Sequence, residues 1–179
     1  LNSTKFAAFT EAQIEALTTT QVAGISNTNL TALGDTQLAS LTATQVAALT
    51  TGQVGALTTD NVAALTETQI GALTTAQVKA LSSTNLSALD ATQAAALTTT
   101  QIAQLTTTQA GALTATDITE LSAEQMGAFT STLLARLGSR DLHCRWLVEI
   151  GHPGEQVTHE ARRILADEVE DQHRAADVA

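Results

Sequence analysis

The chain has 179 residues and a net charge of −10, and only 2 % of its residues are aromatic. Aromatic anchors are common in tight binding sites and enzyme pockets, so this composition disfavours an enzyme. Lys5 and Lys79 are the only basic residues before Arg136, which disfavours both nucleic-acid binding and docking to an anionic membrane surface.

Every eighth residue from Leu1 to Leu137 is a large apolar residue, without insertion or deletion. Such a fixed period predicts a repeat array, in which one small unit stacks on copies of itself. Because the chain begins in register with Leu1 and not with Met, we expect it to be a segment of a longer array. No apolar run reaches the roughly 20 residues of a membrane span, and no signal peptide is visible.

Each octad contains two signals for the start of a helix, as residues 41–48 illustrate. Thr42 and Gln45 have the spacing of a capping box, in which each side chain bonds to the backbone N–H of the other residue. Leu41 before the cap and Val46 in the fourth helical position form the pair of a hydrophobic staple. The cap position holds Thr, Ser, Gly or Asp in every octad from Thr10 to Thr130. The pattern therefore predicts one short helix per octad.

Two other folds compete with this prediction. A single long helix fails because eight residues are not a whole number of turns, so the apolar stripe would rotate by about 80° per octad. A β-solenoid is favoured by the many Thr and Val residues. However, the two apolar positions lie five residues apart, and strict alternation would place them on opposite faces of a strand.

One octad cannot fold alone, because burying its apolar pair gains roughly 3–5 kcal/mol while ordering eight residues costs on the order of 8–16 kcal/mol. Neighbouring octads must therefore cover each pair. The small residue before each Leu, such as Ala48 or Ala80, would let successive helices approach closely. We predict an all-α solenoid of very short helices over residues 1–142, with its Thr and Ser hydroxyls outside.

The sequence also contains a longer repeat, with an interval of seven octads. Residues 25–30 match residues 81–86, seven octads later, and residues 137–142 give a weaker echo. Duplication of a block of sequence is the interpretation we favour. A surface stripe that recurs with the superhelical pitch is the alternative.

The octad is lost after Leu142. Residues 143–179 predict a C-terminal helical cap, since solenoids end in atypical units with a polar outer face; a fused unrelated tail is the alternative. This segment contains His143, Cys144, His152 and His159. Their spacing matches no zinc motif, and no nucleophile pair is formed by adjacent residues. We therefore assign no catalytic, cofactor-binding or metal-binding residue.

The unit Leu-Thr-Thr-x-Gln-Val-x-Ala, as in residues 73–80, resembles the octapeptide arrays of long, low-complexity bacterial proteins described as adhesin-like surface or secreted proteins. The resemblance covers residues 1 to about 142 and implies a surface or secreted location. Our hypothesis is a non-enzymatic rod, spacer or adhesin-like interaction segment with an unknown protein or glycan partner. The alternative is a binding module whose Thr, Ser and Gln surface recognises a periodic target such as glycan, cell wall or ice.

Overall fold

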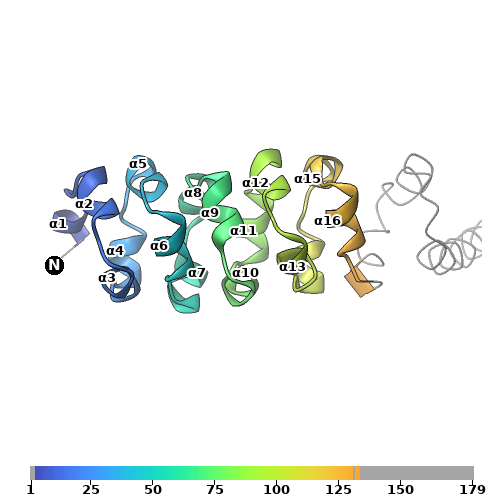
Figure 1. The fold of residues 1–179 in the computed structure, drawn as a ribbon, viewed down its shortest axis with the longest axis horizontal. Helices are drawn as coiled ribbons and strands as arrows, with labels where there is room; N and C mark the ends of the chain where they lie inside the picture. The colour runs from blue at the N-terminus through green and yellow to red at the C-terminus, as the bar shows by residue number, and fades with distance from the viewer. Residues whose placement is uncertain (1–2, 131, 134–179) are drawn as a thin grey trace, which may run out of the picture. The chain divides into compact units, whose positions relative to one another are not determined.

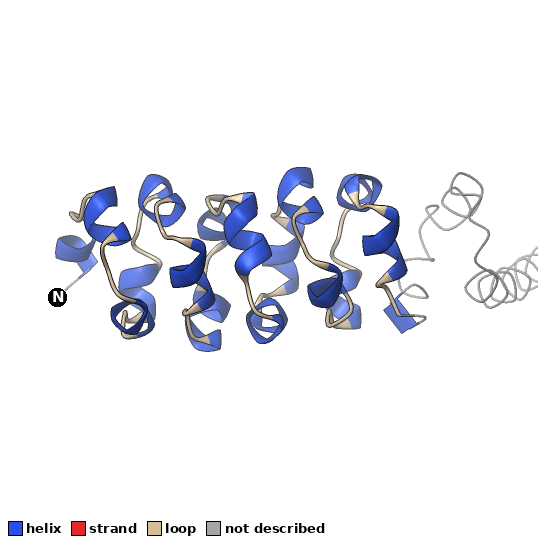
Figure 2. Cartoon of the chain, viewed as in Figure 1, coloured by secondary structure: helices blue, strands red, loops and turns tan. Residues whose placement is uncertain are grey.

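The computed structural model of the chain describes residues 3–130 and 132–133. These residues belong to the first of two compact units, Leu1–His143. The predicted cap over residues 143–179 and the octad residues after 133 lie outside the described residues. Within the described part every element is a helix of four to six residues, and none is a strand (Figure 2). The prediction of an all-α array is confirmed and the β-solenoid is wrong.

In the described part of the chain, each octad from the first to the sixteenth contains one helix. In chain order the helices are α1 (Ser3–Phe6), α2 (Glu11–Glu15), α3 (Thr19–Ala23), α4 (Asn27–Leu30), α5 (Asp35–Ala39), α6 (Ala43–Ala47), α7 (Thr51–Ala56), α8 (Thr59–Ala63), α9 (Glu67–Ala72), α10 (Thr75–Ala80), α11 (Ser83–Ser87), α12 (Ala91–Ala95), α13 (Thr99–Ile102), α14 (Thr107–Ala110), α15 (Ala115–Glu120) and α16 (Ala123–Gly127).

The predicted capping boxes are present in most octads. In α6 the Thr42 hydroxyl accepts the backbone N–H of Gln45 at 3.2 Å, and the Gln45 side-chain oxygen accepts the backbone N–H of Thr42 at 2.7 Å. The cap residue is extended, with φ −68° and ψ 156°, so the chain turns there between successive helices. Helices this short are far below the length at which an isolated helix is stable. Their ends are fixed by these caps and by packing.

Burial follows the octad. If the large apolar residue is counted as position 1, positions 1, 5 and 6 are buried over most of the array, and the cap residue at position 2 is exposed. Positions 1 and 6 form the continuous aliphatic core, for example Leu65 and Ile70 in the α9 octad. The exposed caps confirm that the hydroxyls lie outside. The burial of the polar residue at position 5 was not predicted.

The helices pack against the third helix before and after them in the chain, as in the pairs α7 and α10, α6 and α9, and α12 and α15. The expectation that the small residues bring successive helices together is therefore wrong. A side chain placed on Gly55 in α7 would meet the carbonyl oxygen of Ala80, three octads later, at 3.2 Å. Small residues such as Gly55 and Ala80 therefore permit close approach between turns of the superhelix.

One turn of the superhelix takes between three and four octads. Asn27 bonds to Gly52, 25 residues later, whereas other contacts between turns join residues 28 to 31 apart. Two turns therefore take close to seven octads, which is the interval of the longer recurrence seen in the sequence. Figure 1 shows the consequence: α5 and α12 lie along one edge of the array, and α3 and α10 along the opposite edge. Octads seven apart share a face.

Candidate functional site: the amide ladder and the acidic face

The buried residue at position 5 links the turns of the superhelix. In α9 the Gln69 amide nitrogen donates hydrogen bonds to the backbone carbonyls of Leu38, at 2.8 Å, and Leu41, at 2.6 Å. These carbonyls belong to the C-terminal end of α5 and the residue that leads to α6. The C-terminal carbonyls of a helix have no partner within that helix. The Leu38 carbonyl also accepts the backbone N–H of Leu41 at 3.2 Å, so Gln69 adds a further donor there. For the Leu41 carbonyl, Gln69 is the one donor among the described residues.

The same contact recurs along the array, and we call it the amide ladder. Each member donates its side-chain N–H to a backbone carbonyl 28 to 31 residues earlier. The members are Gln37, Gln45, Gln53, Gln69, Gln77, Asn85, Gln93, Gln101, Gln109 and Gln125.

A glutamine is long enough to serve two helices at once. Gln69 accepts the Thr66 N–H at 2.7 Å through Oε1 while its nitrogen reaches the previous turn. An asparagine does only one of these. Asn61 accepts the Thr58 N–H at 3.1 Å and makes no bond to another turn within the described residues. Asn85 instead bonds to Leu57 at 2.9 Å, and its side chain does not accept the Ser82 N–H. The capping box that the octad pattern predicts is therefore only half formed here: the Ser82 hydroxyl accepts the Asn85 N–H at 3.0 Å, and the return bond is missing.

Sequence reasoning missed the ladder, although one signal was present. A capping box accepts Glu as readily as Gln, and a carboxylate in the first turn is favoured by the helix dipole. Position 5 nevertheless holds Gln or Asn in every octad from Gln13 to Gln125 except for Asp117. The consistent choice of an amide over a carboxylate indicates that an N–H donor is needed there.

The acidic residues of the described array all lie in octads that stack on one face. Stacked acidic octads on this face are three or four octads apart, which are the separations at which octads of adjacent turns contact one another. The acidic residues occur in α2, α5, α8, α9, α12, α15 and α16 or at the caps of these helices. We call this surface the acidic face. Its residues are Glu11, Glu15, Asp35, Asp60, Glu67, Asp90, Glu120 and Glu124, all exposed, and the buried Asp117.

The opposite face is built from residues 17–32, 41–56, 73–88 and 97–112, which contain no Asp or Glu. In Figure 1 the acidic α2, α5, α12 and α15 lie along the upper edge, and the acid-free α3, α7 and α10 along the lower edge. Lys79 lies on the acid-free face, where its ammonium group donates to Gln104 at 2.8 Å. Thr, Ser, Asn and Gln provide nearly all the other polar groups there.

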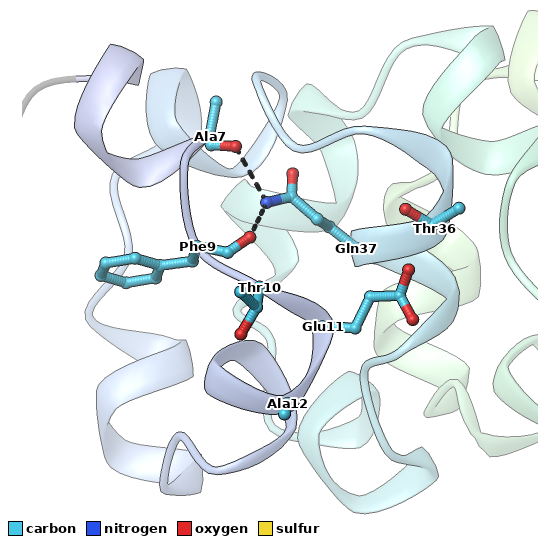
Figure 3. A pocket seen from close by; sticks show the side chains of 7 residues that line it. All are labelled: Ala7, Phe9, Thr10, Glu11, Ala12, Thr36 and Gln37. Atoms are coloured by element: carbon cyan, nitrogen blue, oxygen red, sulfur yellow. Dashed lines mark hydrogen bonds between the residues drawn. The ribbon is translucent and has the colours of Figure 1, made fainter.

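Shallow depressions lie on the acidic face between stacked helices. The first lies between α2 and α5 and is lined by Phe9, Thr10, Glu11 and Thr36, with Gln37 bonded to the carbonyls of Ala7 and Phe9 at its back (Figure 3).

The second depression lies between α9 and α12, where Glu67 and Asp90 contribute two carboxylates. Asp90 caps α12, and the hydroxyl of Thr92 donates to it at 2.7 Å. This bond and that from the Gln93 N–H, at 2.8 Å, hold the pKa of Asp90 below its usual value.

The described residues contain no group of three His, Cys, Asp or Glu side chains that could hold a metal ion. No helix in this part of the chain is long and apolar enough to cross a membrane. The cluster considered from the sequence, with His143, Cys144, His152 and His159, lies outside the described residues.

Comparison with known proteins supports the repeat array. Residues 48–75 and 70–107 match the family model of the ALTTAQ repeat. This part of the chain is similar to the ALTTAQ repeat. The matched region covers the octads from α7 to α13, in which the amide ladder and both faces are present. No curated protein and no solved structure matches the chain.

Proposed function

We propose that this ALTTAQ-like array is a non-enzymatic spacer and docking rod of a larger surface or secreted protein, and that it presents its acidic face to a basic partner. The observation that supports docking is the segregation of charge. The exposed carboxylates lie on one face, and the described part of the opposite face contains a single lysine. Such a distribution produces a directed negative potential that steers a basic surface toward one side of the rod.

The spacing of the layers suggests the form of a suitable partner. Packed helices lie about 8–10 Å apart, and the acidic residues recur in each layer of the stack. An extended peptide advances by about 3.3 Å per residue. A segment with a Lys or Arg at every third residue would therefore match the carboxylates layer by layer.

The docking role is tested with a synthetic peptide that has Lys at every third residue. The variant Glu11→Gln with Glu67→Gln removes two charges from the acidic face, and we expect it to bind the peptide several-fold more weakly, with a smaller dependence on salt. The matched control, Ala47→Lys with Ser87→Lys, changes the net charge by the same amount on the acid-free face. Equal weakening in both variants would show a general charge effect and contradict docking on this face.

The spacer role is supported by the amide ladder, because each bond between turns adds to a continuous stack. Deletion of residues 57–112 removes seven whole octads and preserves the register of both faces. We expect small-angle scattering to show a rod shortened by about 20 Å, the thickness of roughly two layers. An unchanged length, or unfolding of the shortened chain, would contradict a modular rod.

The acid-free face supports a second candidate function. Its exposed hydroxyl and amide groups form an uncharged surface of the kind that hydrogen-bonds to a glycan. Polysaccharide pull-down with the two double variants separates the candidates, because glycan binding on this face would be weakened by Ala47→Lys with Ser87→Lys and not by the glutamine substitutions.

A further inference from the structure

Asp117 occupies the ladder position in α15 and is only 2 % exposed. Its Oδ2 accepts the backbone N–H of Thr114 at 2.7 Å, as the side-chain oxygen of a ladder glutamine would. The second oxygen, Oδ1, is the chemical counterpart of the amide nitrogen of a ladder asparagine or glutamine, and it has no hydrogen-bond donor among the described residues. A buried carboxylate oxygen without a partner is unfavourable.

The groups to which a ladder side chain donates in the preceding turn are backbone carbonyls, which are also hydrogen-bond acceptors. Leu86, Ser87 and Leu89 lie 31, 30 and 28 residues before Asp117, and these are the separations at which Gln69 donates to Leu38, Ala39 and Leu41. No side chain of the described residues donates to the carbonyls of Leu86, Ser87 or Leu89. The Leu86 carbonyl accepts the backbone N–H groups of Ala88 and Leu89. By their separation from Asp117, these carbonyls and Oδ1 correspond to the place where other turns have a side-chain N–H donor.

While Oδ2 caps α15, the Asp117 side chain is too short to reach the previous turn, which leaves room for a further atom; Asn85, of the same length, reaches Leu57 but does not accept the Ser82 N–H. Asn61 has the same length as Asp117 and caps its helix in the same way, and its amide reaches no carbonyl of the previous turn. An atom at the place of the missing nitrogen would contact several oxygens at once. In the Gln69 layer that nitrogen lies 2.6 to 3.3 Å from three carbonyl oxygens.

By analogy with the Gln69 layer, where one nitrogen bridges the corresponding carbonyls, a large, weakly charged ion suits this place. Calcium binds oxygen at about 2.3–2.6 Å and magnesium at about 2.0–2.1 Å, both shorter than most of the ladder distances. Rings of backbone carbonyls at longer range coordinate potassium in ion channels. One carboxylate is balanced by one monovalent cation.

The surroundings of Asp117 favour a cation over a neutral water molecule. Glu120 belongs to α15, and Asp90 caps α12, which packs on α15, so both carboxylates add negative charge to the surroundings of Asp117. Of the two lysines in the described chain, Lys79 is bonded to Gln104 on the other face, and Lys5 lies in α1, at the other end of the described array.

We propose that a monovalent cation of the size of potassium binds between Asp117 Oδ1 and the backbone carbonyls of Leu86 and Leu89. The cation takes the place of the missing amide and joins α15 to the preceding turn. This site is independent of the docking role of the acidic face.

The test is the thermal unfolding of the full chain in potassium chloride and in choline chloride, each at about 150 mM so that screening is equal. For an ion bound with a Kd about ten times lower than its concentration, we expect Tm to be about 3–5 °C higher in potassium. The difference disappears in Asp117→Asn and in Asp117→Gln, the second of which restores the ladder donor and so remains folded. Glu120→Gln, an exposed acidic neighbour, retains the difference.

Three results would overturn the proposal. Equal Tm values in both salts for the unchanged chain would show that water or a proton fills the gap. Loss of the difference in Glu120→Gln would assign it to the acidic face as a whole. In crystals soaked with thallium(I), a heavy-atom analogue of potassium, an anomalous peak is expected between Asp117 and Leu89, and a peak of water alone would also refute the site.

Discussion

Gln69 and Leu41 lie 28 residues apart in the chain, and the Gln69 amide nitrogen donates to the Leu41 carbonyl at 2.6 Å. The oxygen of the same side chain accepts the N–H of Thr66 at 2.7 Å. One side chain thus begins a helix and closes the end of another helix in the preceding turn. Local helix formation and stacking of the superhelix are coupled through this residue.

The substitution Gln69→Glu tests this coupling. A glutamate retains the capping acceptor but replaces the N–H donor by a carboxylate oxygen that faces the carbonyls of Leu38 and Leu41. Because a buried charge and its neighbours lose their partners, we expect a loss of about 2–4 kcal/mol in the free energy of unfolding. Urea unfolding followed by circular dichroism measures it.

Gln13→Glu is the matched control. Gln13 has the same capping box, with the Thr10 N–H at 2.9 Å from its oxygen, but it is exposed and makes no bond to another turn among the described residues. A carboxylate at this place also interacts favourably with the helix N-terminus. We expect a change within about 0.5 kcal/mol. An equally large loss in both variants would mean that the cap alone, and not the ladder, explains the effect.

Local features of the fold could be predicted from the sequence. The Thr-x-x-Gln spacing and the flanking Leu and Val define caps, staples and helices of a few residues, because these interactions join residues close in the chain. The capping box of Thr42 and Gln45 is an example. The match of one octad to one helix follows directly from that spacing.

The stacking between turns could not be predicted, because it depends on how many octads complete a turn. The octad period is the same for every superhelix built from it, so it does not fix whether Gln69 meets the second or the fourth octad before it. The alignment of the acidic residues on one face also depends on the number of octads in each superhelical turn. Glu11 and Glu67 lie seven octads apart in the chain, and they share a face only because seven octads make close to two turns.

Asn61→Gln should strengthen the array. The added methylene allows the amide to reach the carbonyls of Leu30 and Leu33, at the separations used by the other ladder residues, while the oxygen still caps α8. We expect a gain of about 0.5–1.5 kcal/mol, the usual net value of a buried hydrogen bond. Gln21→Asn, at an exposed position whose side chain makes no bond between turns in the described array, should have little effect. No gain in Asn61→Gln would show that the shorter side chain already has a partner of equal strength.

Asp90 should make the free energy of unfolding depend on pH. The hydroxyl of Thr92 and the N–H of Gln93 lower the pKa of Asp90 in the folded state. The stability that ionised Asp90 contributes is therefore fully present above the pKa of the unfolded chain, about 3.9. It is lost as the pH falls through the lower pKa of the folded state. The stability difference between the unchanged chain and Asp90→Asn should therefore shrink between about pH 5 and pH 2. Thr92→Ala removes the larger cause and should reduce this dependence. A difference that is constant with pH would contradict the lowered pKa.

Leu73→Asp tests which octads share a core. Leu73 is 4 % exposed at the start of the α10 octad, and an unpaired charge there would be costly. Because α10 packs on α7 and α13, hydrogen exchange should accelerate in those two helices at least as much as in the sequence neighbours α9 and α11. Ala76→Asp places the same charge in the exposed first turn of α10, where the helix dipole favours it, and should leave exchange unchanged. Acceleration confined to α9 and α11 would show that the core is shared along the chain and not between turns.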